Sequence, residues 1–166
     1  MLTLFLFTVF PLLVIGAAVS DLFTMTIPNP ISFLLVAGFL AAALLTGLTG
    51  QEIVLQLGCA MAVLVIGFTF FALGWIGGGD AKLAAAITLW LSLGSLLDYA
   101  MLAAVYGGIL TIAILSLRTL PLPAFALGWS WLTRLHDRKT GVPYGIALAA
   151  AALTVFPTTP LWRAAL

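Results

Sequence analysis

Residues 53–76 read IVLQLGCAMAVLVIGFTFFALGWI, an apolar run without a charged side chain, and this run decides the class of fold. About 20 apolar residues form a helix long enough to cross the hydrocarbon core of a bilayer. A single segment in lipid satisfies its backbone hydrogen bonds internally only as a helix. The run therefore predicts a transmembrane helix.

Similar apolar runs lie on both sides of it. Of the 166 residues, 64% are hydrophobic and 7% are charged, against about 25% charged in an ordinary soluble domain. We expect further spans at residues 2–20 and 30–48, a fourth starting after Asp80, a fifth ending before Arg118 and a sixth starting near Pro143. The expected fold is all-α: a polytopic membrane protein of about six transmembrane helices, with residues 1–166 forming a single domain.

Residues 2–20 are expected to remain as a span. No Lys or Arg precedes the run, and the run is longer than the apolar region of a typical signal peptide. Three helix boundaries have local signals. Asn29 before Pro30 predicts an N-cap with proline at the first helical position. Residues 77–79 (GGG) predict a break. The Ser95–Asp98 spacing is that of a capping box and predicts a new helix that starts after Gly94.

The basic residues predict the orientation. If six helices span the membrane, one side holds most of the cations: Lys82, Arg118, Arg134, Arg138 and Lys139. The other side holds Arg163. The positive-inside rule then places the loops after the odd-numbered spans in the cytoplasm. Residues 125–131, in the long loop 118–142, are rich in aromatic side chains and predict an amphipathic segment on the membrane surface.

Acidic side chains are few, and they are not equal candidates for a functional site. The chain has Asp21, Glu52, Asp80, Asp98 and Asp137. Glu52 falls in a short hydrated loop, Asp98 fits a helix cap, and Asp137 lies among basic residues as an expected surface ion-pair partner. Asp21 closes the first span and Asp80 opens the fourth, and an ionisable group at a span is a functional candidate by default.

Asp21 and Asp80 are expected at the same membrane face, because two complete spans separate them and the chain leaves and returns between them. Two close carboxyl groups share one proton, since both do not ionise easily. The ionised member can take a proton from an attacking water while the protonated member supports the oxyanion, which is the chemistry of an aspartyl protease.

Other interpretations of this pair stay open at the level of sequence. Intramembrane acids also serve proton or cation transport, although no internal repeat supports a transporter. A noncatalytic assembly protein is a third possibility. Residues 77–79 either let a substrate backbone approach Asp80 closely or form a flexible turn that Asp80 caps.

Two motifs resemble those of the type IV prepilin peptidases, a family of GxGD aspartyl membrane proteases. Residues 77–83 (GGGDAKL) resemble the active-site motif around the second aspartate, and Asp21 followed by residues 27–29 (IPN) resembles the first. Residues 142–145 (VPYG) resemble the segment before the last span of the family. In that segment, Tyr144 is expected either to anchor at the interface or to shape the substrate cleft.

The resemblance implies a function and a set of site residues. It makes Asp21 and Asp80 the catalytic aspartates, and it implies a membrane aspartic endopeptidase that removes the short basic leader of prepilins or pseudopilins at the cytoplasmic face of a bacterial inner membrane. Residues that would contact the substrate are Gly77, Gly78, Gly79 and Lys82. Lys82 also fits a cation that snorkels to the interface.

The short connection from Asp21 to Pro30 and the single Cys59 depart from larger members of the family, which carry paired CxxC motifs. The chain therefore resembles the compact CpaA/TadV-like subfamily that serves Flp-like pili, without methyltransferase activity. No cofactor or metal is expected, the near-zero net charge gives no basis for a nucleic-acid partner, and the pattern does not define an oligomeric state.

Overall fold

The computed structural model describes residues 2–123 and 127–163, and all of the regular structure in these residues is helical. The α-helices are α1 (Leu2–Thr24), α2 (Asn29–Thr46), α3 (Gly50–Ala72), α4 (Gly78–Thr88), α5 (Leu96–Leu117), α6 (Ser130–His136), α7 (Gly145–Val155) and α8 (Pro160–Arg163). Short 3-10 turns, η1 (Leu93–Ser95) and η3 (Phe156–Thr158), precede α5 and follow α7.

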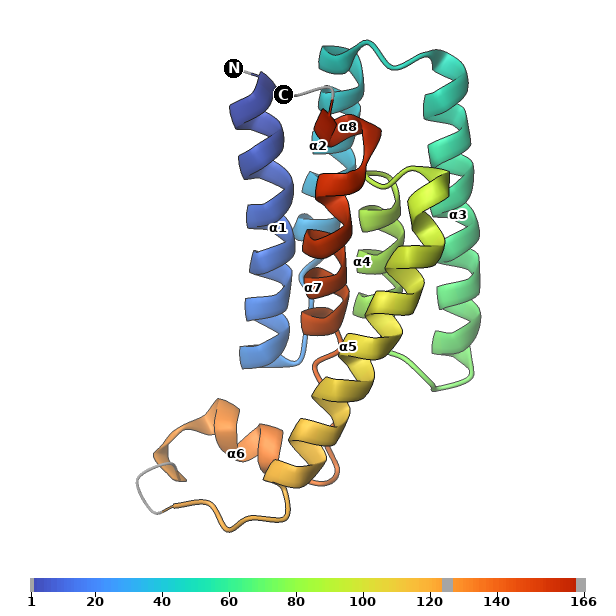
Figure 1. Cartoon of the computed structure of the whole chain (residues 1–166). Helices are drawn as coiled ribbons and strands as arrows, with labels where there is room; N and C mark the ends of the chain where they lie inside the picture. The colour runs from blue at the N-terminus through green and yellow to red at the C-terminus, as the bar shows by residue number, and fades with distance from the viewer. Residues whose placement is uncertain (1, 124–126, 164–166) are drawn as a thin grey trace.

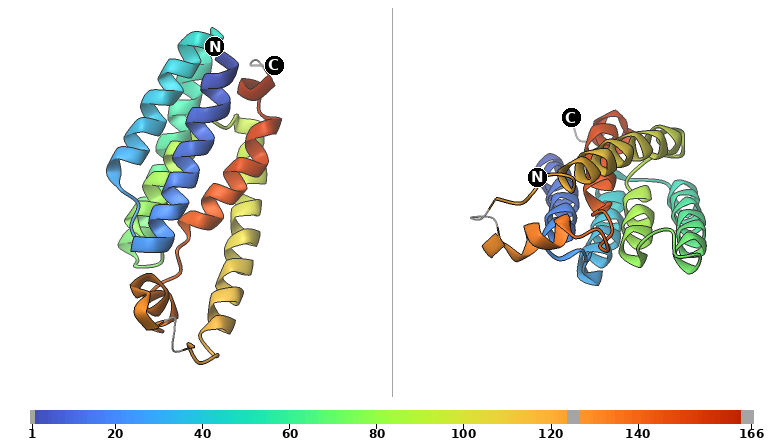
Figure 2. Two further views of the ribbon diagram at one scale, coloured as in Figure 1. Left: turned by 90° about the vertical axis from the view of Figure 1, so that its left-hand side faces the viewer. Right: turned by 90° about the horizontal axis from the view of Figure 1, so that it is seen from below.

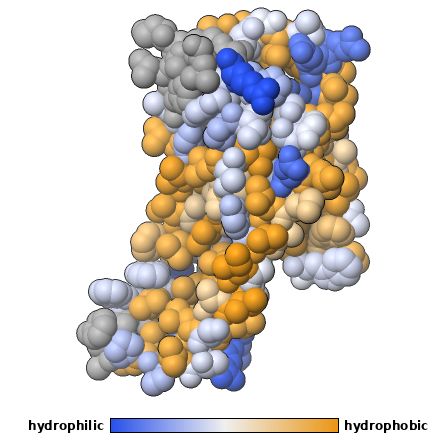
Figure 3. Space-filling model, viewed as in Figure 1, coloured by the Kyte–Doolittle hydropathy of each residue, from blue (hydrophilic) through white to orange (hydrophobic). Residues whose placement is uncertain are grey.

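Three helical segments are long and apolar enough to cross a membrane: Asn29–Thr46, Gly50–Ala72 and Leu93–Leu117. Shorter apolar helices cover Thr8–Thr24 and Gly145–Thr158. Hydrophobic side chains cover most of the visible face of the molecule, as a lipid-facing surface requires (Figure 3). The expected all-α polytopic architecture is confirmed.

The helices form an up-and-down bundle in which α4 and α7 occupy the interior. α4 packs against α3 and α2, while α7 packs between α1 and α5 (Figure 1). The α1–α2 and α3–α4 connections lie at the lower end in Figure 1, as do the segment from α5 to α7 and α6. The α2–α3 connection and the C-terminal end lie at the opposite end. α6 lies beyond the bundle at the lower end (Figure 2).

An aromatic cluster fixes the half of the bundle away from this lower end. The fully buried Trp90, just after α4, contacts the rings of Phe10, Phe39 and Phe156 from three other elements. Its indole Nε1 donates a hydrogen bond to the carbonyl of Leu35 at 2.9 Å. Large buried aromatic side chains contribute much of the packing energy of a core, so this cluster sets the position of α4 against α1, α2 and α7.

The fourth span differs from the expectation. α4 begins at Gly78, so Asp80 lies inside its first turn, and the helix has 11 residues. A helix of this length covers about 16 Å, less than the thickness of the hydrocarbon. Neighbouring helices cover α4 in the bundle interior, where its Leu83 and Ile87 are fully buried.

One predicted cap is wrong, and a second is confirmed only in part. Pro28 is the N-cap of α2, and Asn29 is the first helical residue. Ser95 is the N-cap residue of α5, which starts after Gly94 as predicted, but its side chain makes no capping hydrogen bond and its hydroxyl pairs with that of Ser92 at 3.0 Å. The aromatic segment predicted at residues 125–131 lies partly outside the described residues, and α6 begins at Ser130.

Candidate active site

Asp21 lies in the last turns of α1 and is 6% exposed. Its Oδ2 accepts a hydrogen bond of 2.8 Å from the backbone N–H of Gly145, the first residue of α7. A Cβ added at Gly145 would lie 2.8 Å from this Oδ2 and 2.9 Å from Cδ1 of Ile27. A side chain at position 145 would therefore displace Asp21 or Ile27, so the close approach of α7 to Asp21 favours glycine there.

Asp80 lies in the first turn of α4 and is half-buried. The N-terminus of a helix exposes unpaired N–H groups and favours an anion. The carboxylate of Asp80 lies against the N-cap residue, since a Cβ added at Gly77 would be 3.0 Å from its Oδ2. The glycine thus leaves one side of this carboxylate open.

The two carboxylates line one cavity of about 290 Å³ at the lower end of the bundle. Its other lining residues come from the α1–α2 connection and the start of α4: Met25, Thr26, Ile27, Gly77, Gly78, Gly79 and Lys82. Asp21 and Asp80 are close enough to interact electrostatically. A cavity of this size, lined by polar groups, admits water beside both acids.

The α1–α2 connection is a compact turn held by short hydrogen bonds. Met25 has a φ of 55°, in the left-handed region that is uncommon for a side chain other than glycine. The Ser20 hydroxyl donates to the Thr26 carbonyl at 2.9 Å, and the hydroxyls of Thr24 and Thr26 pair at 2.7 Å. Backbone strain of this kind persists where the surrounding structure enforces it. Two residues later, Ile27 is buried.

Ile27 packs between the starts of α4 and α7, where small residues make room for it. It is buried, and a Cβ added at Gly79 would lie 3.3 Å from the Ile27 Cβ. A Cβ added at Gly78 would likewise lie 3.3 Å from the Phe71 ring. The glycine run therefore has a packing role beside its effect on access to Asp80.

Lys82 joins the two sequence motifs. Its Nζ donates a hydrogen bond of 2.8 Å to the Oδ1 of Asn29. No acidic residue in the described part of the chain forms an ion pair with this ammonium group. Lys82 is therefore directed across the α2–α4 interface at the rim of the cavity.

The remaining acids are placed elsewhere. Glu52 forms a capping box with Thr49 at the start of α3, accepting from its backbone N–H at 2.8 Å. Asp98 is exposed in the first turn of α5, and Asp137 is exposed and accepts from the N–H of Lys139 at 2.9 Å. Among the residues that the structure describes, Asp137 forms no ion pair, so its predicted role is wrong.

Ile27 and Gly145 lie in the quoted motifs, but the sequence predicts no role for them, and it leaves two roles open for Tyr144. The Tyr144 hydroxyl donates to the Ala103 carbonyl at 3.1 Å, and its ring occupies the space of the missing side chain at Gly107. It thus anchors the start of α7 to α5. The buried hydroxyl of Tyr99 has no hydrogen-bond partner within the described ranges.

Two acids that line one small cavity at one end of an apolar bundle define a membrane protein equipped for acid–base chemistry. Residues 8–112 match the model of the type IV leader peptidase family. The chain therefore belongs to this family, whose members are prepilin aspartic peptidases, and it is a multi-pass membrane enzyme. Neither a curated protein nor a solved structure matches the chain. Gly145 and α7, which hold Asp21, lie beyond the matched residues.

Proposed function

We propose that Asp21 and Asp80 are the catalytic pair of a peptidase that removes the basic leader of Flp-like prepilins. The observation that carries the proposal is the shared cavity of about 290 Å³, to which helices separated by two complete spans bring both carboxylates. Because the cavity lies at the end of the bundle, one segment of the substrate can reach it from the membrane–water interface while the rest of the substrate stays in the bilayer.

Hydrolysis needs no more than these two groups and one water. The ionised carboxylate takes a proton from the water while the water oxygen attacks the peptide carbonyl carbon. The protonated carboxyl donates to the developing oxyanion and, as the C–N bond breaks, a proton passes to the leaving amine. Gly145 N–H keeps Asp21 in place during these steps, because it occupies one lone pair of Oδ2.

The orientation supports cleavage on the cytoplasmic side. Lys82, near the start of α4, lines the cavity, and the connection that carries Arg138 and Lys139 lies at the same end of the bundle (Figure 1). Cytoplasmic loops carry the excess of cations. A basic leader is retained on that side for the same reason. The short connection between α1 and α2 supports the compact CpaA/TadV-like subfamily, and we propose that residues 1–166 act as a single peptidase domain.

Co-expression with an Flp-type prepilin in a host that lacks such a peptidase tests the proposal. Asp21→Asn and Asp80→Asn should each lower the rate of leader removal by about 100- to 10,000-fold, the usual contribution of a general acid or base. Leader removal is measured by the mobility of the pilin on gels and by N-terminal sequencing of the product.

Two other acidic positions are the matched controls. Asp98→Asn and Glu52→Gln change an acid to its amide at sites outside the cavity, in the first turns of α5 and α3. Both variants should process the leader at nearly the rate of the unmodified protein. Continued processing by either Asp21→Asn or Asp80→Asn, in protein that has reached the membrane, would refute the assignment.

A further inference from the structure

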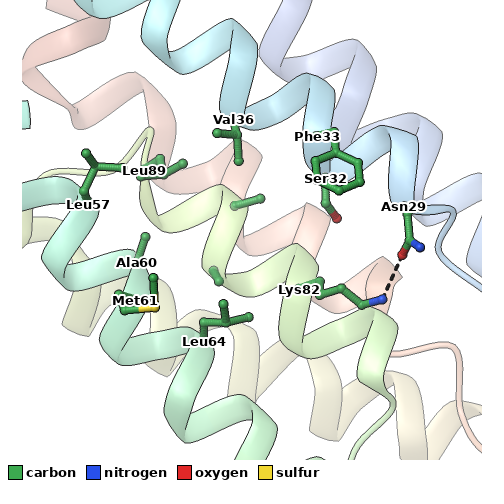
Figure 4. Close-up of a pocket in the computed structure, with 12 residues that line it drawn as sticks. Asn29, Ser32, Phe33, Val36, Leu57, Ala60, Met61, Leu64, Lys82 and Leu89 are labelled. Carbon is green, nitrogen blue, oxygen red and sulfur yellow. Dashed lines mark hydrogen bonds between the residues drawn. The ribbon is translucent and has the colours of Figure 1, made fainter.

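A second cavity, of about 460 Å³, lies between α2, α3 and α4 (Figure 4). Its walls are mainly apolar side chains, among them Phe33, Val36, Leu57, Met61, Leu64 and Leu89. Small residues, Ala60, Ala85 and Ala86, lie along its α3 and α4 sides. Small residues in membrane helices allow another helix to approach closely. We call this cavity the apolar groove.

The apolar groove borders the cavity of the two aspartates, because Lys82 lines both. The hydrogen bond from Lys82 to Asn29 crosses this end of the groove (Figure 4). Along α4 the groove runs from Lys82 to Leu89, which is about two helical turns, or roughly 10 Å. A chain that enters at the aspartates and continues past Lys82 therefore enters the groove.

The groove is open to the bilayer. Phe33 and Met61 are exposed on its α2 and α3 sides, in helices that face lipid. An apolar helix can thus move in from the membrane without exposing its backbone or side chains to water. Its packing against the groove replaces contacts with lipid, which is how helices associate within membranes.

We propose that the apolar groove binds the first turns of the membrane helix of the uncleaved substrate. This proposal rests on the function proposed above, because it uses the scissile bond at Asp21 and Asp80 as its starting point. Lys82 sets the direction of the bound chain. Its positive charge disfavours the basic leader at the mouth of the groove, and its ammonium group donates to a carbonyl of the extended segment between the scissile bond and the helix.

A photo-reactive amino acid placed at Met61 or Met101 tests the proposal in the inactive Asp80→Asn background. These two methionines are matched, since they are 59% and 60% exposed in α3 and α5, and Met101 is not part of the groove. With a full-length Flp-type prepilin in the same membrane, irradiation should crosslink prepilin to position 61 and not to position 101. Crosslinking to phospholipid alone at position 61, or equal crosslinking of prepilin at both positions, would overturn the proposal.

A kinetic measurement separates the groove from the catalytic pair. Met61→Trp fills the groove, and it should slow cleavage of full-length prepilin about tenfold more than cleavage of a soluble peptide that spans the leader junction but lacks the membrane helix. Met101→Trp should affect both substrates equally. If Asp21→Asn and Asp80→Asn are inactive but Met61→Trp behaves like Met101→Trp, the groove proposal alone fails. If the aspartate variants remain active, the proposed function itself fails.

Discussion

Asp21 is held by a helix that begins 124 residues later in the chain, whereas Asp80 lies in the first turn of its own helix, next to a glycine run. Asp21 is buried, and a backbone N–H fixes one of its oxygens. Asp80 is half-buried, and its close neighbour Gly77 belongs to the same turn. The position of Asp21 therefore depends on tertiary packing, while that of Asp80 depends mainly on local backbone geometry.

This difference identifies α7 as part of the site. α7 contributes no acidic side chain, but its first residue supplies a backbone donor and, by lacking a side chain, the space that Asp21 and Ile27 fill. A change at the start of α7 should therefore disturb catalysis more than an equally small change beside Asp80. The two glycines that contact the carboxylates allow a direct comparison.

Gly145→Ala should have the largest effect of the glycine substitutions. The new Cβ would be 2.8 Å from the Oδ2 of Asp21 and 2.9 Å from the Cδ1 of Ile27. It would also be 3.2 Å from the Cβ of Asp21, which does not move when the side chain rotates, so α7 or Asp21 as a whole must shift. A displacement of about 1 Å at a catalytic group can cost about 100-fold in rate. We expect a loss of that order in kcat for leader removal, measured in purified enzyme.

Gly108→Ala is the matched control for this prediction. Gly108 is also helical, in α5, and a Cβ added there meets no atom within 4 Å. This variant should keep its activity. If Gly145→Ala is as active as Gly108→Ala, the position of Asp21 does not depend on the start of α7.

Gly77→Ala should have a smaller effect. Its Cβ would lie 3.0 Å from the Oδ2 of Asp80, an oxygen at the end of a side chain that can rotate. Forcing a side chain away from its preferred rotamer costs about 0.5–1.5 kcal/mol, which corresponds to about a two- to tenfold loss of rate. Initial rates of leader removal from the same prepilin measure this loss. Gly94→Ala is the control, because a Cβ added at Gly94 meets no atom within 4 Å. A loss larger than that of Gly145→Ala would reverse the comparison between the two aspartates.

The sequence predicts the convergence of Asp21 and Asp80 because it follows from the number of spans between them, and that number is read directly from apolar runs. It does not predict the contact with Gly145, because the donor is a backbone N–H that every residue except proline carries. The pairing of Lys82 with Asn29 was missed for a related reason. Asn before Pro resembles a local cap, and its tertiary partner lies 53 residues away.

Two capping patterns with the same residue spacing show that local geometry decides whether a capping box forms. Thr49 and Glu52 form the capping box, whereas Ser95 and Asp98, at the same spacing, do not. Glutamate is longer than aspartate by one methylene and reaches back to the N-cap backbone. Ser95 also has helical rather than extended backbone angles, with φ −98° and ψ −4°, which is not the usual geometry of an N-cap. The difference in side-chain length between the two motifs can be read from the sequence, whereas the backbone angles of Ser95 are known only from the structure.

Tyr144→Phe should have the smallest effect. It removes the hydrogen bond to the Ala103 carbonyl and leaves the ring against Gly107, so we expect a loss of about 1 kcal/mol in the free energy of unfolding and nearly unchanged cleavage. Unfolding in mixed micelles measures the first, and leader removal the second.

Tyr106→Phe is the control, because its hydroxyl pairs with Thr154 at 3.3 Å in an exposed position and should contribute less. If folded Tyr144→Phe protein lost cleavage, the hydroxyl would act on the reacting groups, and the start of α7 would contribute to the chemistry as well as to the position of Asp21.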